Sequence, residues 1–560
     1  MSLTGKKDSF ITKIYARLLP VQIILVAIQS INGIVDGIMG SRLLGSDAMA
    51  AVGLFAPLLT LLYAFGCIII VGSQIVGSHY AGKGETDKIS KIFSVTLCFI
   101  AIVGFIAAIF ISIFNAQLST LLKGDNLLSD YMLGVAFSFL FDSLCGVLSD
   151  YLQLIGNVKR TYIGLIALIT SNILLNVIFI RFLELGIFGL GLATTLSTFI
   201  TCFIMAGVFF DSKSPIHFTL MQLPWRKLGE ILRFGSSAAT FNIVLALKGF
   251  ALNYIVLFFG GQIALGAMAV ENSILGLIGA ISVGIGTTTL TIGSVFYGEE
   301  DREAVKSVFR VSLKVGITLA LIVTIVIMGF SRPLSVMFYG KEAAVRSILQ
   351  DILVLSTIYI PLNVIICVFT KMYHIQGQMI LTNILSFLEN GLVIIVAFVL
   401  GILFRLRGIW LSLPVSSLML LLGLIAYIWI KNKKISFEEE ELILLSDTFR
   451  GNSDNNMYIN IFGDTDISEI LSQIKAFIIC HEVNKHDAEN FFAYIVELIK
   501  HQFKQYNMFN ISIIYKENNI IVRIRNNDRD FKPLNISSEY KTEIQTHLGI
   551  SEVKVSLQTE

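Results

Sequence analysis

Long apolar segments and short polar connections alternate along the chain from residue 18 to about residue 431. Each apolar segment holds roughly 20 residues, the length that an α-helix needs to cross a hydrocarbon core of about 30 Å. We count about twelve, centred near residues 29, 60, 102, 141, 171, 199, 247, 280, 320, 360, 392 and 420. The pattern predicts an all-α membrane protein with twelve transmembrane helices.

Composition agrees with this prediction. Of the 560 residues, 55% are apolar and only 15% are charged, which excludes an ordinary soluble globular protein. The first apolar segment is too long for a cleaved signal peptide, and no small-residue cleavage site follows it. The formal net charge of +2 does not indicate any class of partner.

The positions of the basic residues predict the orientation in the membrane. Lys and Arg concentrate in the N-terminal segment and in alternate connections, which by the positive-inside rule face the cytoplasm. These residues are Lys6, Lys7, Lys13, Arg17, Lys83, Lys88, Lys91, Lys159, Arg160, Lys213, Arg226, Lys227, Arg233, Arg302, Lys306, Arg310, Lys314, Lys431, Lys433 and Lys434. We expect a multi-pass protein of the plasma membrane with both termini in the cytoplasm.

The cysteines show no paired spacing. Five lie in apolar segments (Cys67, Cys98, Cys145, Cys202 and Cys367), and Cys480 lies near the C-terminus. We therefore expect no disulfide and no metal site.

Composition changes sharply near residue 432. The charged and polar stretch KNKKISFEEEELILLSDTFRGNSDNN leads into about 105 residues of soluble character. In this tail, MYINIF predicts a strand, DISEILSQIKAFIIC and DAENFFAYIVELIKHQF predict helices, and ISIIYKENNIIVRIRNN predicts two strands that turn at residues 517–519. The tail should be a small α+β cytoplasmic domain.

The membrane part repeats itself. AMAAVGLFAPL is similar to GAMAVENSIL, and SHYAGKGETDKISKIFSV is similar to SVFYGEEDREAVKSVFRV, at an offset close to 217 residues. Such an offset spans about six helices, so the pattern favours two parallel six-helix lobes with a cavity between them. The expected units are an N-terminal lobe at 10–215, a C-terminal lobe at 216–432, a linker at 433–455 and the tail at 456–560.

Four stretches in this order resemble the multidrug and toxic compound extrusion (MATE) transporters. They are Pro20, IVDGIMGSRLLGSDAMAAVGLFAP, GSHYAGKGETDK and GLGLATTLS. The resemblance covers residues 10 to about 432. It implies a V-shaped pair of lobes that alternates between inward-open and outward-open states. It also implies an antiporter that exports organic, often cationic, compounds against Na+ or H+.

Asp36 is an acid inside the first apolar segment, where an ionised side chain costs several kcal/mol unless it is paired with another charge or faces a hydrated cavity. Protonation of the acid also avoids this cost. Gln22, Gln29, Asn32 and Asp36 share one stripe of a helix. An amide would join helices without an ionisation penalty, so the glutamines favour interhelical hydrogen bonding. Asp36 instead favours taking up a coupling ion, either H+ or Na+.

Oxygen-bearing side chains on later helices could help Asp36. Asn172 and Asn176 lie four apart on the fifth helix, and Thr194 lies on the sixth. In the DinF-type branch of the family, to which the chain is most similar, the matching positions hold Asp, Asn and Thr together with a second Asp. Ile180 stands at the place of that second acid, which favours proton coupling. The acidic position of the NorM-type branch aligns with Asn363.

Further charges lie inside other apolar segments. Asp142 belongs to the first lobe, and Lys248, Glu271 and Glu389 belong to the second. We expect Lys248 to pair with Glu271 or Glu389, either as a fixed ion pair or as a gate that breaks during the cycle. An unpaired Glu271 or Asp142 would attract a cationic substrate, and nearby Phe rings would add cation–π contacts.

The tail resembles the GHKL ATPase domains of anti-sigma-factor kinases, but the residues for ATP do not match. Glu497 is followed by His501 where Asn should hold Mg2+, and Asn526 and Asp528 replace the adenine-binding Asp and the Gly after it. Only Gly549 is left of the glycine-rich phosphate segment. We expect a degenerate, nucleotide-free module that serves as an appendage, binds a cytoplasmic protein or controls transport. No cofactor is expected beyond the coupling ion.

Two alternatives stay open. A flippase of lipid-linked saccharides belongs to the same broad superfamily, but it would need several basic residues for phosphate, and Lys248 is nearly alone. A polytopic sensor kinase would need a dimerising helix with a phosphoacceptor His before the tail, and the linker is too short. Nucleic acid is not an expected partner; the expected partners are an organic small molecule and the lipid bilayer.

Overall fold

A computed structural model describes most of the chain. The described residues are 8–44, 46–122, 125–211, 214–338, 343–445, 455–462, 467–481, 485–505, 508–516, 519–526 and 540–558.

The first lobe consists of α2 to α8. Its elements are α2 (Ser9–Leu43), α3 (Ser46–Lys83), α4 (Thr86–Leu121), α5 (Asn126–Val135), α6 (Ser138–Leu154), α7 (Val158–Val177), the π-helical turn η1 (Ile178–Phe182) and α8 (Gly186–Ala206). The second lobe begins with the short η2 (Trp225–Lys227) and continues with α9 (Leu228–Gly298), α10 (Arg302–Phe338), α11 (Ala343–Ser356), α12 (Tyr359–Ile375) and α13 (Met379–Asn432). Within the described residues, eleven helical stretches are long and apolar enough to cross a membrane.

Two of the long helices contain a residue with positive φ, where the helix is broken. Gly261 in α9 (φ 63°, ψ −166°) and Arg405 in α13 (φ 55°, ψ −138°) leave the helical region of backbone angles. The 54 residues of α13 would otherwise extend about 80 Å, far more than a bilayer core. A Cβ built on Gly408 would lie 2.0 Å from the carbonyl oxygen of Leu400, so the chain doubles back at Arg405.

One pair of equivalent hydrogen bonds agrees with the predicted internal repeat. Ser73 and Thr96 join α3 to α4 by a hydrogen bond of 2.9 Å, and Thr289 and Ser312, each 216 residues later, join α9 to α10 over the same distance. Because matching side chains join matching helices, both lobes use the same plan.

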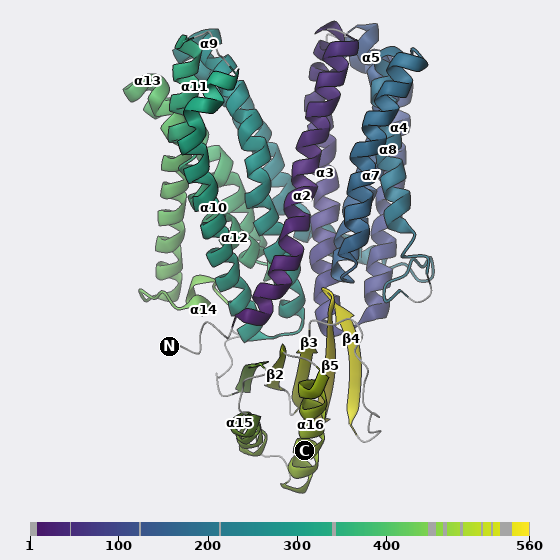
Figure 1. Ribbon diagram of the computed structural model, residues 1–560, viewed down its shortest axis with the longest axis vertical. Helices are drawn as coiled ribbons and strands as arrows, with labels where there is room; N and C mark the ends of the chain where they lie inside the picture. The colour runs from purple at the N-terminus through teal and green to yellow at the C-terminus, as the bar shows by residue number, and fades with distance from the viewer. Residues whose placement is uncertain are drawn as a thin grey trace.

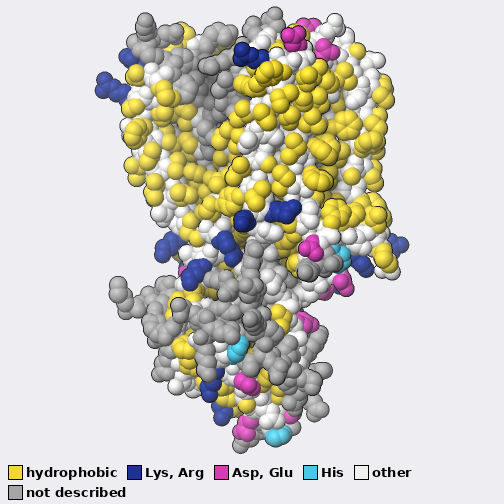
Figure 2. Space-filling model, turned by 45° about the vertical axis from the view of Figure 1, so that its right-hand side comes forward, with side chains coloured by type: hydrophobic (Ala, Val, Ile, Leu, Met, Phe, Trp, Pro, Cys, Tyr) yellow, Lys and Arg dark blue, Asp and Glu magenta, His cyan; other side chains and the backbone are white. Residues whose placement is uncertain are grey.

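The lobes converge at one end and diverge at the other. In Figure 1 the helices of the two lobes meet near the tail and separate away from it, and α2 runs obliquely between them. Figure 2 shows a broad apolar surface on the lobes, with Lys and Arg gathered near its lower edge. Phe258 of α9 and Ile380 of α13 are each 80% exposed, as expected for side chains that contact lipid.

The tail is an antiparallel sheet with two helices. Its elements are β1 (Asn456–Phe462), α15 (Ile467–Cys480), α16 (Lys485–Gln505), β2 (Met508–Lys516), β3 (Asn519–Asn526), β4 (Lys541–His547) and β5 (Ile550–Gln558), with the strand order β1-β2-β3-β5-β4. Lys516 pairs with Asn519, which confirms the predicted hairpin. Phe491 and Ile495 of α16 pack with Ile511 and Val522 of the sheet in one buried cluster.

A short helix in the linker fastens the tail to the second lobe. It is α14 (Glu439–Leu442), and it lies beside α10. Glu439 accepts from Arg310 over 2.5 Å and Glu440 from Lys306 over 2.8 Å. Burial alone would raise the pKa of Glu440, but Arg302 and Lys306 outweigh it, so the pKa lies below its usual range. The linker is therefore held by charge at neutral pH.

Candidate functional site

Asp36 accepts two hydrogen bonds from other helices of the first lobe. Asn176 on α7 donates its Nδ2 to Oδ1 of Asp36 over 2.8 Å, and Thr194 on α8 donates its Oγ1 to Oδ2 over 3.1 Å. Among the residues that the structure describes, no basic side chain forms an ion pair with this carboxylate. The residues matched to the DinF-type branch therefore meet at one point where three helices adjoin.

Two buried amides beside Asp36 each have one polar atom without a partner among the described residues. Asn172 accepts from Asn176 over 3.1 Å, and both side chains are fully buried. Asn172 Nδ2 and Asn176 Oδ1 have no hydrogen-bond partner in the described part of the chain. Because buried polar atoms are nearly always paired, these two atoms indicate room for a water, a protonated carboxyl group or a cation next to Asp36.

The neighbouring hydroxyls of α8 bond to their own helix. Ser197 and Thr198 donate to the carbonyl of Thr194, and Thr201 donates to that of Ser197. This is the usual arrangement for Ser and Thr in membrane helices. Thr194 also contacts the carbonyl of Leu190, over 3.3 Å, but it differs from the others in reaching Asp36 as well.

The path of α2 positions Asp36. Near the tail, the hydroxyl of Tyr15 donates to the carbonyl of Ile285 on α9 over 3.1 Å. Further along, Gln22 donates to Gln153 of α6 over 2.8 Å, which confirms its predicted role in joining helices. α2 thus contacts the second lobe at its tail end and reaches α7 and α8 at Asp36, as its oblique course in Figure 1 shows.

Not every member of the predicted stripe can be located. The side chains of Gln29 and Asn32 lie outside the described residues. Ile180 belongs to the π-helical turn η1 and is 8% exposed. The position at which the resemblance to the DinF-type branch implies a second acid therefore holds a buried apolar side chain.

The second lobe contains a cavity of about 330 Å³ lined by several of the predicted charges. The polar residues on its wall are Lys248, Glu271, Asn272, Asn363, Glu389 and Asn390. Tyr359 and Trp410 add aromatic surface. The cavity therefore combines acids, one cation and aromatic rings, which suits an amphipathic organic ligand.

Within the described chain, Lys248 does not form the ion pair with an acid that the sequence predicted. Its ammonium donates to the amide oxygen of Asn390 over 2.8 Å, and within the described chain no ion pair joins it to Glu271 or Glu389. Glu389 instead accepts from Asn363 over 2.8 Å. Glu389 and Asn390 are adjacent on one helix and point about 100° apart, so Lys248 reaches the amide and Asn363 reaches the acid.

Other intramembrane charges stand apart from these two sites. Asp142 lies partly exposed on α6 and forms no hydrogen bond or ion pair with the described residues. The sequence interpretation missed Asp150, the second acid of α6, and Lys371, the only Lys or Arg of α12. Their signal is the same as that of Asp36, an ionisable residue among apolar ones.

The residues compared with an ATP site are dispersed or occupied. Glu497 and His501 lie on α16, and Asn526 at the end of β3 donates to Gln502 over 3.0 Å. Asp528 lies outside the described residues. Gly549 belongs to the tight turn between β4 and β5, with φ 70°, and Arg17 donates to its carbonyl over 2.9 Å. The carbonyl of Gly549 is therefore in contact with the membrane part.

Relatives of known name match most of the membrane part. "Probable multidrug resistance protein YoeA" of Bacillus subtilis is 26% identical over 431 residues, covering 73% of this chain and 92% of that protein. "Multidrug export protein MepA" of Staphylococcus saprophyticus is 22% identical over 426 residues, covering 74% of this chain and 94% of that protein.

Solved structures share the fold. "Crystal structure of MATE in complex with MaL6" superposes with a TM-score of 0.70 at 22% identity, covering 76% of this chain and 96% of that one. "Outward-facing conformation of a multidrug resistance MATE family transporter of the MOP superfamily" gives 0.69 at 22% identity, covering 77% and 97%. The MatE family model matches residues 22–180 and 238–399, more than half of the chain. This chain therefore belongs to the MATE transporter family.

Proposed function

We propose that the protein is a secondary antiporter that exports organic compounds, cationic or amphipathic, in exchange for H+ or Na+. The observation that carries the proposal is the Asp36 carboxylate, held by Asn176 and Thr194 without a basic partner in the described chain. The names of the relatives, which describe multidrug resistance and export, support the substrate class.

Protonation of Asp36 would change its contacts. An ionised carboxylate only accepts hydrogen bonds, whereas the protonated acid also donates one. The Asn176 amide now donates to Oδ1 of Asp36, so a proton on that oxygen would require the amide oxygen of Asn176 instead. A half-turn of the amide would supply that oxygen, which has no partner at present. The charge state of Asp36 is thereby coupled to the packing of α2 against α7.

The rival ion is Na+. The same amide rotation would present an oxygen to a bare cation, together with the Asp36 carboxylate and the Thr194 hydroxyl. With Ile180 in place of a second acid, the site holds one formal negative charge. A single carboxylate is enough to bind one proton, but it would bind Na+ only weakly. We therefore favour H+ as the coupling ion.

The cavity of the second lobe would bind the exported compound. Two acids, Glu271 and Glu389, face a single cation, Lys248, so ionised acids would leave an excess of negative charge. Tyr359 and Trp410 would add cation–π attraction of about 0.5–2 kcal/mol for an organic cation. Release would follow when uptake of the coupling ion in the first lobe shifts the balance between the two open states.

The proposal also includes a membrane topology of twelve crossings. The chain reversal inside α13 would split it into two crossings, which gives twelve in all. With both termini and the tail in the cytoplasm of a plasma-membrane protein, the lobes of Figure 1 would diverge toward the outside. The structure would then represent the outward-open state.

The tail would be a nucleotide-free GHKL-like module. In support, Gln502 bonds Asn526, and Arg17 covers Gly549. Titration of the purified protein with labelled ATP and Mg2+ should give no binding at micromolar concentration. Micromolar affinity would reject this part of the proposal.

Transport in proteoliposomes tests the main proposal. The purified protein is reconstituted, and accumulation of a fluorescent organic cation is followed with an imposed H+ gradient and, in separate vesicles, an imposed Na+ gradient. Accumulation that needs one gradient and stops when an ionophore removes it supports the antiporter. No accumulation with either gradient, but movement of a labelled lipid-linked saccharide, would favour the flippase.

A further inference from the structure

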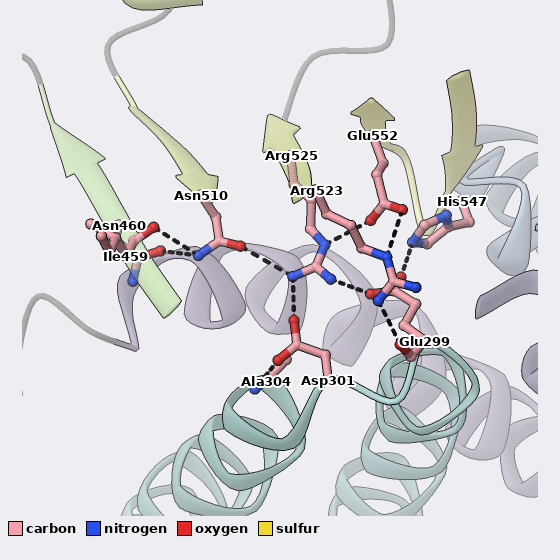
Figure 3. Close-up of polar contacts among 10 residues, drawn as sticks. All are labelled: Glu299, Asp301, Ala304, Ile459, Asn460, Asn510, Arg523, Arg525, His547 and Glu552. Atoms are coloured by element: carbon pink, nitrogen blue, oxygen red, sulfur yellow. Dashed lines mark hydrogen bonds and ion pairs between the residues drawn. The ribbon is translucent and has the colours of Figure 1, made fainter. Parts of the chain in front are cut away.

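Arg525 of β3 joins the tail to the second lobe through a buried ion-pair network (Figure 3). Its Nη1 donates to Asp301 over 2.8 Å, and its Nε donates to Glu552 of β5 over 2.7 Å. Its Nη2 pairs with Glu299, and its guanidinium lies 5.2 Å from the ring centre of Phe296 on α9. Arg525 itself is 0% exposed. The tail therefore holds the connection between α9 and α10 by charge-assisted hydrogen bonds.

The network is charged. Burial alone would raise the pKa of Asp301, but Arg525 and the backbone N–H of Ala304 outweigh it, so the pKa lies below its usual range. Burial likewise raises the pKa of Glu552, and Arg525 and Arg523 reverse the shift. Breaking the contact would leave charges buried without partners, which is strongly unfavourable.

A metal ion is a weaker explanation of the cluster. Glu299, His547 and Glu552 each bring one ligand atom within 4.8 Å of the others, a spacing that a metal could bridge. Both carboxylates already pair with Arg525, and Arg523 Nε lies 3.5 Å from Glu552. Two guanidinium groups would repel a divalent cation at this place.

The turn between β4 and β5 contacts the first lobe. The backbone N–H of Leu548 donates to the carbonyl of Leu154 at the end of α6 over 2.6 Å. A Cβ on Gly156 would lie 2.3 Å from Gly549, so the two glycines touch. Leu548 is 0% exposed and belongs to the hydrophobic cluster of the membrane part. The tail thus contacts both lobes with one sheet.

The lobes also touch each other at this end. Gln74 of α3 donates to Thr291 of α9 over 2.8 Å. A Cβ on Gly82 would lie 2.0 Å from the carbonyl oxygen of Val295, and one on Gly298 would lie 2.3 Å from that of His79. Opening on the tail side would separate these surfaces, and the sheet that spans them could not remain attached to both.

We infer that the tail is a latch that holds the tail-side ends of the two lobes together, and that opening on this side requires it to release one lobe. The inference rests on the proposed alternating-access function. Arg525 anchors the latch on the second lobe, and Leu548 anchors it on the first. The tail would thereby favour the state of Figure 1, which opens away from it.

Two variants weaken the two anchors separately. Arg525→Gln removes the charge that holds Glu299 and Asp301. Leu548→Asn removes the buried apolar side chain; because Leu548 has φ 52° and precedes Gly549, Asn suits the turn and should preserve the hairpin. Lys554→Gln is the matched control, since within the described chain Lys554 forms its ion pair with Glu543 of the neighbouring strand, over 3.1 Å, and not with either lobe.

Spin labels report the separation of the lobes in the full chain. Lys159 at the start of α7 and Lys431 near the end of α13 are exposed at the tail end of each lobe, and each is replaced by a labelled cysteine. Cys480 is exposed and is replaced by Ser in this background. Pulsed electron paramagnetic resonance then gives the distance distribution between the two labels.

We expect one short distance in the parent protein and in Lys554→Gln, and an added population at longer distance in Arg525→Gln and in Leu548→Asn. Hydrogen exchange checks that the tail is folded in both anchor variants. If the tail is folded and the distances between the spin labels are unchanged in both variants, the latch is overturned. Transport by the parent protein is measured in parallel. If the parent transports while the distances do not change, only the latch fails, whereas a parent that transports nothing refutes the proposed function.

Discussion

Asn176 donates a 2.8 Å hydrogen bond to Asp36, which lies 140 positions earlier in the chain. The bond links α7 to α2, and α2 also contacts the second lobe near the tail through Tyr15. A change in the charge of one carboxylate can therefore act on a helix that both lobes share. This is the physical basis of the coupling that we propose.

Removing the amide of Asn176 should impair coupling. In Asn176→Ala the Asp36 carboxylate keeps only Thr194 as donor, and an unsatisfied buried acceptor costs about 1–3 kcal/mol. We expect gradient-driven export in proteoliposomes to fall roughly tenfold. Ser171→Ala is the control, because the Ser171 hydroxyl bonds the carbonyl of Ala167 on its own helix. Equal export rates in Asn176→Ala and Ser171→Ala would show that Asn176 has no role in coupling.

Close packing of the lobes should require glycine at position 82. In Gly82→Ala the new Cβ would meet backbone atoms of Val295 and Glu299, which no side-chain rotation can relieve. Overpacking of this kind costs about 1–3 kcal/mol, so export should fall and the tail-side distance should lengthen. Gly53→Ala on the same helix has open space around the new Cβ and should behave like the parent. If Gly82→Ala exports like the parent and keeps the parental distance between the spin labels, close packing of the lobes does not require glycine at this position.

The charge of Lys248 should limit the affinity for cations. Lys248→Gln keeps a donor for Asn390 but removes the positive charge beside Glu271 and Glu389. At the distances within one cavity, loss of one charge changes the binding of a monovalent cation by roughly tenfold. We expect tighter binding of an organic cation by fluorescence titration and unchanged binding of a neutral analogue. Weaker binding of the cation would place the ligand elsewhere.

Docking of the tail should resist mild acid. Carboxylates with a lowered pKa in the docked state stabilise docking above their usual pKa of about 4 and lose this effect as the pH falls through the lowered value. Asp301 and Glu552 are both of this kind, and they face Arg525, Arg523, Glu299 and His547. The spin-label distance should therefore be the same at pH 7.5 and pH 5.5 and should lengthen only below about pH 4. Release of the tail between pH 7.5 and 5.5 would contradict the charged network.

Much of the fold follows from local patterns in the sequence. Apolar segment length predicts the long helices, and alternation predicts the hairpin of β2 and β3. The side chains around Asp36 could also be predicted from the sequence. A single acid among apolar residues has few functions, and the family resemblance names its neighbours. The hydrogen bonds from Asn176 and Thr194 agree with that prediction of proximity.

Other features depend on contacts that one sequence cannot specify. Lys248 was expected to meet an acid, but the adjacent Asn390 lies closer, and only the helix rotation decides between neighbours. Arg523 and Arg525 alternate on one face of β3, which signals a charged surface. Their acceptor Glu299 is more than 220 residues earlier, and docking of the whole tail brings it there.

Gradient-driven transport by Asp36→Asn tests the central claim most directly. The asparagine has nearly the same shape as the acid but cannot change its charge. Parent and variant are reconstituted at equal density, and accumulation of an organic cation is measured with an H+ gradient and, separately, with a Na+ gradient. We predict that the parent responds to one gradient and that Asp36→Asn responds to neither while remaining folded. Accumulation by Asp36→Asn at the parental rate would contradict the claim.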